Sequence, residues 1–284
     1  MREPQLEVVV GMTGVGKTYT TKEVIRRYVL SDVKTGRKTR PVLVVDINGE
    51  YTEYKAIDFD IDDLDEYNRS SEIRGITVPK PYRVLTWHKN HEPMTPDEII
   101  STCATVARYF RNGLIVMEDI NQYMLSHLNV DIIGLLVSLR HKGTDLTIHY
   151  QNLKAVPPRM WANLSYLRIH KYTDNIDDFK SRVTNYELCK LAEIIVNDQY
   201  RKGNIRYYVW AGIRDEKLIP CSDIGFEQIF EDACIQYLSI NKRPIRDYME
   251  LIDREGNKKY SSRQEAVNDW IAERKVQYIG SQSR

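Results

Sequence analysis

The N-terminal end of this 284-residue chain carries the pattern that most restricts how it can fold. An apolar run over residues 6–10 is followed by Gly11, four further residues, and then Gly16-Lys17-Thr18. A continuous apolar run predicts a strand that is buried on both faces of a parallel sheet. Glycines at these spacings let the backbone wrap a polyphosphate with its N–H groups. The sequence therefore predicts a strand, a phosphate-binding loop and a helix, in that order.

The helix expected after the loop directs the partial positive charge of its N-terminus at the phosphates. Lys17 is expected to reach the outer phosphates, and Thr18 is expected to offer its hydroxyl to Mg²⁺. The pattern thus predicts ATP and Mg²⁺ as cofactors, and a glycine-rich turn that binds nothing is the alternative. The residues predicted to bind the nucleotide are Gly11, Thr13, Gly14, Val15, Gly16, Lys17, Thr18 and Tyr19.

Two adjacent carboxylates follow another predicted strand, at residues 114–117. Phosphoryl transfer depends mainly on positioning and charge stabilisation, so such an enzyme needs one carboxylate for Mg²⁺ and another that polarises the attacking water. We assign Glu118, with Thr18, to the metal and Asp119 to the water. The order of the two acids leaves an exchange of these roles open, and a capped strand end is the alternative.

Two further predicted strands, at residues 42–45 and 146–150, also end in polar residues. The carboxyl ends of parallel strands form the ligand-binding edge of a sheet. Asp46 and Glu50 are therefore possible site residues, although an ordinary turn in which Asp46 bonds its own backbone is the alternative. Gln151, at the tip of its strand, is well placed to sense the terminal phosphate, and a glutamine that caps a loop is the alternative.

Composition restricts the partners and the compartment. Lys and Arg number 41 against 40 Asp and Glu, so the net charge gives no indication of a nucleic-acid partner. No apolar run approaches the roughly 20 residues that span a bilayer, and the N-terminus lacks the apolar core of a signal peptide. We therefore expect a cytoplasmic protein without a membrane partner. Four scattered cysteines fit neither a disulfide framework nor a zinc pattern and are predicted to be unpaired: Cys103, Cys189, Cys221 and Cys234.

The pattern of predicted helices and strands changes near Asp174. Helices are predicted at residues 176–186, 187–200, 226–239 and 263–276, and strands at residues 205–212 and 217–220. We therefore predict a P-loop ATPase motor domain over residues 1–190 and a C-terminal appendage, a β-hairpin with helices, over residues 191–284. The basic loop at residues 34–40 is predicted either to contact nucleic acid or to be solvated surface. The basic C-terminal part is predicted either to contact DNA or a partner protein or to be a solvated helical appendage.

Four stretches together resemble the HerA–FtsK superfamily of DNA-translocating ATPases, which includes viral genome-packaging ATPases. They are residues 8–18, 45–51, 114–119 and 138–151, and Asn163 lies where a family Asn usually follows. The resemblance, which covers roughly residues 5–185, implies a RecA-like α/β core with a mostly parallel sheet flanked by helices, and the predicted elements beyond it form a small C-terminal α+β appendage. It also implies that Arg140 is the arginine finger, with Arg159 as second candidate, and that Gln151 couples the γ-phosphate to movement.

The resemblance further implies a motor that hydrolyses ATP and assembles into a hexameric or pentameric ring around double-stranded DNA. Genome packaging in a virus or phage is the first expectation, in the host cytoplasm and docked on the procapsid through a portal or capsid protein. A plasmid or cellular HerA-like translocase is the alternative within this class. A P-loop kinase for small molecules and a nucleotide-gated assembly module are the rivals from other classes.

Overall fold

The computed structural model describes residues 4–30, 39–57, 70–73, 76–88, 90–119, 134 and 138–280. These residues form two compact units, Met1–Tyr166 and Leu167–Arg284, which are described separately below. The amphipathic pattern of residues 131–140 predicts a further helix, and this segment lies mostly outside the described residues.

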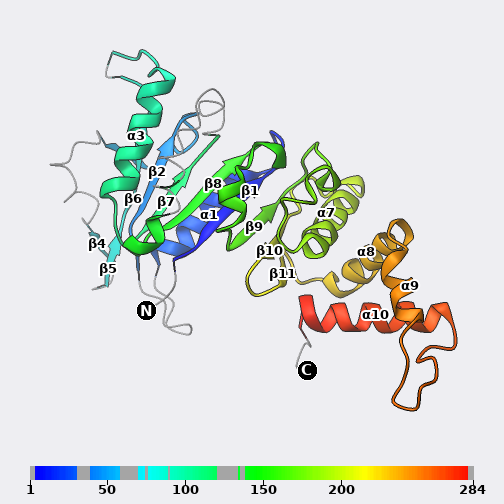
Figure 1. Cartoon of the computed structure of the whole chain (residues 1–284). Helices are drawn as coiled ribbons and strands as arrows, with labels where there is room; N and C mark the ends of the chain where they lie inside the picture. Colours follow the sequence, from blue (N-terminus) through cyan, green and yellow to red (C-terminus); the bar gives the residue numbers. More distant parts are fainter. Residues whose placement is uncertain are drawn as a thin grey trace. The chain divides into compact units, whose positions relative to one another are not determined.

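A parallel sheet with the strand order β1-β8-β7-β2-β6-β3 forms the centre of the first unit (Figure 1). All neighbouring pairs in this order are parallel. The predicted α/β core with a mostly parallel sheet is therefore confirmed. The strands are β1 (Leu6–Val10), β2 (Val42–Asp46), β3 (Lys55–Ile57), β6 (Pro81–Leu85), β7 (Leu114–Met117) and β8 (Asp145–Tyr150), and an antiparallel pair stands apart, β4 (Ser70–Ile73) and β5 (Ile76–Pro79).

Two long helices, α1 (Lys17–Val29) and α3 (Pro96–Tyr109), cover opposite faces of this sheet (Figure 1). The crossover from β1 to β2 and the crossover from β6 to β7 run in opposite directions along the strand order. Right-handed crossovers in opposite directions place their helices on opposite faces. Shorter helical pieces complete the unit: η2 (Leu139–Lys142), η3 (Leu153–Ala155) and α6 (Pro158–Trp161).

The core of the first unit lies between α1 and the central strands. Ile25 and Tyr28 of α1 belong to one buried cluster with Val44 of β2 and Val116 of β7. All four residues of β7 are buried, because alternate side chains point to the two covered faces of the sheet. Burial on both faces explains why these strands appear in the sequence as continuous apolar runs.

A buried carboxylate, Asp145, fixes the opposite end of β8 from the predicted site. It accepts hydrogen bonds from Tyr28 Oη at 2.5 Å and from Arg40 Nη1 at 2.9 Å, and Arg40 also donates to the carbonyl of Gly143. Arg40 therefore connects the segment before β2 to the start of β8. The rest of the predicted basic loop, at residues 34–38, lies outside the described residues.

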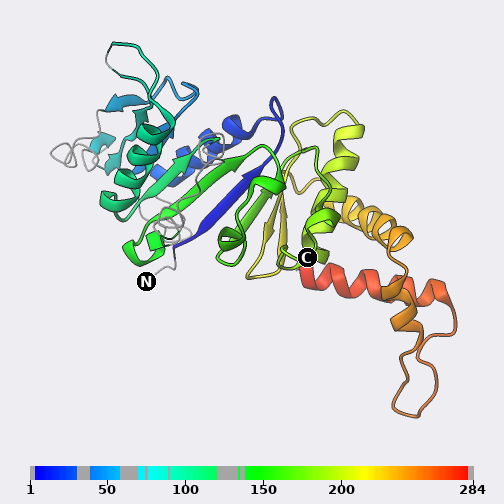
Figure 2. The same cartoon turned by 45° about the horizontal axis from the view of Figure 1, so that its top comes forward.

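The second unit contains a small sheet with the order β11-β10-β9, and a group of helices packs within the same unit. Trp270 is fully buried and stacks on Tyr237, with ring centroids 5.8 Å apart. Figure 2 shows the loop between the last two helices, in orange, extending beyond both of them. The elements are β9 (Tyr166–Ile169), η4 (Ile176–Phe179), α7 (Tyr186–Arg201), β10 (Val209–Gly212), β11 (Lys217–Pro220), α8 (Phe226–Ile240), α9 (Arg243–Met249) and α10 (Arg263–Tyr278).

The predictions for the second unit are confirmed in part. The strand at 217–220 and the helices near 226–239 and 263–276 are present. The helix predicted over 176–186 is wrong, because only the short turn η4 forms and Asn185, at φ 53°, takes a left-handed conformation that no α-helix contains. The strand predicted from residue 205 begins only at Val209, and α9 is an addition.

The predicted division into domains at residue 190 stays a prediction, and α7 runs across that position as one helix. All four cysteines are free, as expected, and three of them are buried. None of the helices in the described part of the chain is long and apolar enough to cross a membrane.

Helix α3 begins with a reciprocal pair of hydrogen bonds that the Thr95-Pro96-Asp97-Glu98 pattern predicts. The Thr95 hydroxyl accepts from the backbone of Glu98, and the Glu98 carboxylate accepts from the backbone of Thr95. Thr95→Ala removes one of these bonds and is expected to lower the free energy of unfolding by about 1 kcal/mol, measured by urea denaturation. Ser101→Ala, at an exposed position inside the same helix, is the control and should change it by less than about 0.5 kcal/mol. Equal losses in the two variants would contradict the role of the cap.

Candidate nucleotide-binding site

The carboxyl ends of β1, β8, β7 and β2 meet at one edge of the sheet, and the predicted site lies there. The loop after β1 is fixed at its start by the backbone N–H of Gly11, which donates to the carbonyl of Tyr150 at 3.1 Å. Gly14 and Gly16 have φ angles of 85° and 89°, a left-handed conformation that favours glycine at both positions. The loop thus turns directly into α1 and leaves the first N–H groups of the helix without helical acceptors.

Lys17, the first residue of α1, folds back over its own loop. Its Nζ donates to the carbonyl of Gly11 at 2.5 Å and to that of Met12 at 3.1 Å. Burial lowers the pKa of Lys17, and the negative charges of Asp119, Glu118 and Glu50 oppose this effect without cancelling it. The ammonium group therefore lies within electrostatic reach of three carboxylates at the same sheet edge.

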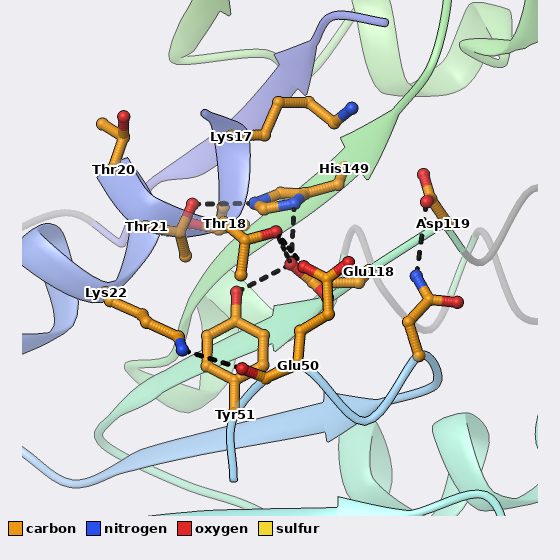
Figure 3. A network of polar contacts seen from close by, with 12 residues as sticks. Lys17, Thr18, Thr20, Thr21, Lys22, Glu50, Tyr51, Glu118, Asp119 and His149 are labelled. Carbon is orange, nitrogen blue, oxygen red and sulfur yellow. Dashed lines mark hydrogen bonds and ion pairs between the residues drawn. The ribbon is translucent and has the colours of Figure 1, made fainter. Parts of the chain in front are cut away.

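The hydroxyl of Thr18 lies between two carboxylates (Figure 3). Thr18 Oγ1 is 2.5 Å from Oε2 of Glu50 and 3.0 Å from Oε1 of Glu118. These two acids come from different segments, the turn after β2 and the end of β7. The structure thus brings the P-loop threonine together with the predicted metal carboxylate and with a second acid.

Glu118 is 2% exposed, and the described residues that contact its carboxylate all reach one oxygen, Oε1. Besides Thr18, Oε1 contacts Tyr51 Oη at 2.8 Å and His149 Nδ1 at 3.2 Å. Burial alone raises the pKa of Glu118, but the hydrogen bonds that it accepts outweigh burial, and its pKa lies below the usual value. The other oxygen, Oε2, is buried and has no hydrogen-bond partner among the described residues.

Two residues of this network, Tyr51 and His149, were not predicted as site residues from the sequence. His149 is 1% exposed, and its Nε2 lies 2.9 Å from the hydroxyl of Thr21 in α1. The available signal was the alternation along β8, where Asp145, Thr147 and His149 place polar groups on one face. The contact itself depends on strand order, because β8 lies between β1 and β7.

Asp46 is fully buried and shapes the turn that carries Glu50. Its carboxylate accepts from the backbone N–H of Glu50 at 2.9 Å, from that of Tyr51 at 3.2 Å, and from Arg83 Nη1 at 2.9 Å. Gly49 has a φ of 69°, which the tight turn requires. Asp46 therefore makes the contacts of the alternative interpretation, a turn in which it bonds the local backbone. Through these hydrogen bonds it fixes the position of Glu50.

Asp119 lies apart from the Glu118 cluster and is directed toward the turn after β2 (Figure 3). Its Oδ2 accepts from Asn48 Nδ2 at 3.4 Å, and its Oδ1 is buried without a hydrogen-bond partner in the described part of the chain. Its φ of 42° is a left-handed conformation, which Asp tolerates better than most residues. The two adjacent acids thus point in different directions and are available for different tasks.

The donor set at this edge suits magnesium. Thr18, Glu50 and Glu118 offer oxygen atoms, which Mg²⁺ prefers, and Oε2 of Glu118 is a buried carboxylate oxygen with no described donor. No group of three or more His, Cys, Asp or Glu side chains in the described residues is arranged as a metal site. Mg²⁺ usually takes only one or two carboxylates and completes its shell with water and phosphate oxygens. The residues therefore fit a metal that arrives with a nucleotide.

The sequence comparison decides the family. Residues 8–156 match the family model of the helicase HerA central domain, which covers β1 to β8 and the site at their carboxyl ends. The chain belongs to the HerA family. The resemblance to the HerA–FtsK superfamily is thereby confirmed. No curated protein sequence matches the chain significantly.

Several solved structures are similar to this HerA-family chain. The DNA-packaging ATPase B204 from Sulfolobus Turreted Icosahedral Virus shares 13% identity, with 77% of this chain and 98% of that chain covered and a TM-score of 0.49. The genome packaging NTPase B204 from Sulfolobus turreted icosahedral virus 2, in complex with ATP-gammaS, shares 14% over 78% and 98%, with a TM-score of 0.49. The pCW3 conjugation coupling protein TcpA with ATPgS shares 11% over 77% and 59%, with a TM-score of 0.41.

The remaining predicted site residues of the HerA-family chain differ in how far the structure describes them. Gln151 follows β8 at the same edge as Glu118 and is half-buried. Arg159 lies in α6, is exposed, and its carbonyl accepts from Asn163 Nδ2 at 2.9 Å. Arg140 lies in η2, and its side chain falls outside the described structure. The catalytic roles of these residues stay predictions.

The lowered pKa of Glu118 predicts how this side chain affects stability as the pH changes. A carboxylate whose pKa is lowered by folding stabilises the native state above its unfolded value, here 4.5, and this stabilisation is lost as the pH falls through the folded value. The difference in unfolding free energy between the wild type and Glu118→Gln should therefore be largest near neutral pH and shrink below about pH 5. Urea denaturation of both proteins without nucleotide or metal, at several pH values between 7 and 3.5, measures it. A difference that does not change with pH would contradict the hydrogen-bonded carboxylate described here.

Proposed function

We infer that this HerA-family protein is an ATP-hydrolysing motor that forms a ring and moves double-stranded DNA. The observation that carries this inference is the position of Thr18 between Glu50 and Glu118 at the carboxyl edge of a parallel sheet. That edge is where α/β proteins of this type bind ligands. Within this class we propose genome packaging in a virus or phage, on the basis of the sequence resemblance, and a plasmid or cellular translocase is the alternative.

Nucleotide binding is assigned to the loop and the start of α1. The backbone N–H groups of residues 13–19 and the positive end of the helix attract the phosphates. Lys17 exchanges its bonds to two loop carbonyls for bonds to the outer phosphates. Thr18 and Glu118 would hold Mg²⁺, with Glu50 as an additional oxygen donor, and the metal would supply positive charge beside the phosphates.

Hydrolysis is assigned to Asp119, which orients the attacking water. Its Oδ1, which is buried without a hydrogen-bond partner among the described residues, can accept a hydrogen bond from that water, and its charge lies within electrostatic reach of Lys17. Gln151, at the tip of the neighbouring strand, contacts the γ-phosphate. When this phosphate leaves, the changed position of Gln151 is transmitted to the rest of the motor. The kinase alternative is disfavoured because family membership and two acids beside the P-loop favour water as the acceptor.

Further positive charge for hydrolysis comes from a neighbouring subunit of the ring. Arg140 of a neighbouring subunit reaches the nucleotide and stabilises the charge that develops during phosphoryl transfer. Such a residue acts only across an interface, so hydrolysis depends on assembly. Arg159, which is exposed, is the second candidate for this role.

The first test compares ATP hydrolysis with and without double-stranded DNA. The wild type should hydrolyse ATP over many turnovers, and DNA should raise the rate, whereas a small-molecule kinase would be indifferent to DNA. Lys17→Ala should lower the rate by at least about 100-fold, because it removes a charge that stabilises the transition state. An equally active Lys17→Ala variant would overturn the nucleotide site, and a rate that DNA does not change would overturn the motor.

The second test addresses the arginine finger. Arg140→Ala alone should lower the rate about 10³-fold, since a finger of this kind contributes that much or more. Mixing inactive Arg140→Ala subunits with inactive Lys17→Ala subunits should restore activity, because some interfaces then combine an intact P-loop with an intact Arg140. The same mixture made with Arg159→Ala identifies the alternative. An assembled Arg140→Ala ring with undiminished turnover would show that the assignment is wrong.

A further inference from the structure

His149 is a buried, polar residue to which no sequence motif assigns a role. It lies on β8, two residues before Gln151, and is 1% exposed. Its two ring nitrogens contact different elements, Glu118 after β7 and Thr21 in α1 (Figure 3). The imidazole therefore bridges the first helix and the carboxylate that is proposed to hold the metal.

The chemistry of the partners defines what each nitrogen does. A carboxylate accepts hydrogen bonds and does not donate them, so Nδ1 of His149 carries the hydrogen in its contact with Glu118. Nε2 lies 2.9 Å from the hydroxyl of Thr21, which can donate to this nitrogen or accept from it. The bond on one side of the ring thus fixes the orientation of the nitrogen on the other side.

Three side chains converge on one oxygen of Glu118. Tyr51, Thr18 and His149 come from the turn after β2, from α1 and from β8, and all of them contact Oε1. Oε2 is left buried and without a donor among the described residues. A carboxylate that is held on one oxygen from three directions presents the other oxygen in a fixed direction.

We propose that His149 is a positioning residue that holds Glu118 so that Oε2 faces the metal of a bound nucleotide, an inference that rests on the proposed ATP hydrolysis. His149 touches neither phosphate nor metal and acts only through Glu118. Partners of metal-binding carboxylates that lie outside the coordination shell typically change metal affinity or activity by 10- to 100-fold when they are replaced. A histidine that served only the core would change stability and leave magnesium dependence as it is.

The two nitrogens can be tested separately. Asn places its amide N–H near the position of Nδ1, and Gln places its amide near the position of Nε2. His149→Asn therefore keeps the donor to Glu118, whereas His149→Gln keeps only the contact with Thr21. Thr147→Val is the matched control, because Thr147 is buried on the same face of β8 and bonds Glu7 at 2.8 Å, away from the site.

The main readout is the affinity for a fluorescent ATP analogue, measured with Mg²⁺ and again in EDTA, for the full-length protein. The ratio of the two dissociation constants reports how strongly the metal aids binding. This ratio should fall about 10-fold in His149→Gln and stay within about threefold of the wild type in His149→Asn and Thr147→Val. The kcat should follow the same order, while affinity in EDTA is similar in all four proteins.

Three results would overturn the inference about His149 and leave the proposed function untouched. They are an unchanged ratio in His149→Gln, an equal fall of the ratio in His149→Asn and His149→Gln, or a comparable fall in Thr147→Val. If His149→Gln does not fold, Thr21→Val replaces it, since it frees the ring on the side of α1, and an unchanged ratio there also counts against the inference. A wild type that binds nucleotide with magnesium but does not hydrolyse it overturns the proposed function. That result leaves the binding ratios as a separate measure of the role of His149.

Discussion

The hydrogen bond between Thr18 and Glu118 joins the start of α1 to the end of β7, and the candidate site depends on it. These two residues are far apart in the sequence, and only the strand order of the parallel sheet brings them together. The same edge receives the end of β8 and the turn after β2. A small set of polar side chains can therefore meet there, while β7 and residues 42–45 of β2 remain apolar on both faces.

The buried carboxylates of the first unit are stabilised in different ways. At the end opposite the site, the buried carboxylate of Asp145 is paired with Arg40, and below the site Asp46 is paired with Arg83. Among the described residues, Glu118 forms no ion pair with an Arg or Lys; hydroxyl groups and His149 hold it, and Lys17 lies within electrostatic reach. A buried carboxylate without a paired Arg or Lys is suited to receive a cation from outside the protein.

Much of the site was predictable because the information is local in the sequence. The loop after β1 could be recognised from its glycine spacing, and Glu118 from its place after an apolar strand. His149 was not predictable in this way, because a single histidine in a buried strand has the same local signature whether it packs in a core or supports a site. The failed helix over 176–186 has a related cause, since the left-handed Asn185 interrupts a stretch whose composition suits a helix.

The left-handed backbone at Asp119 explains why the acids follow one another as Glu-Asp. At position 118 the longer side chain spans the gap to Thr18, Tyr51 and His149, and an aspartate there would be one methylene too short. At position 119, with φ 42°, a short side chain that can bond locally is tolerated, and a glutamate pays more strain. Interchanging the two acids would thus conserve charge and composition yet disturb both positions, so this ordering is a property of the backbone path.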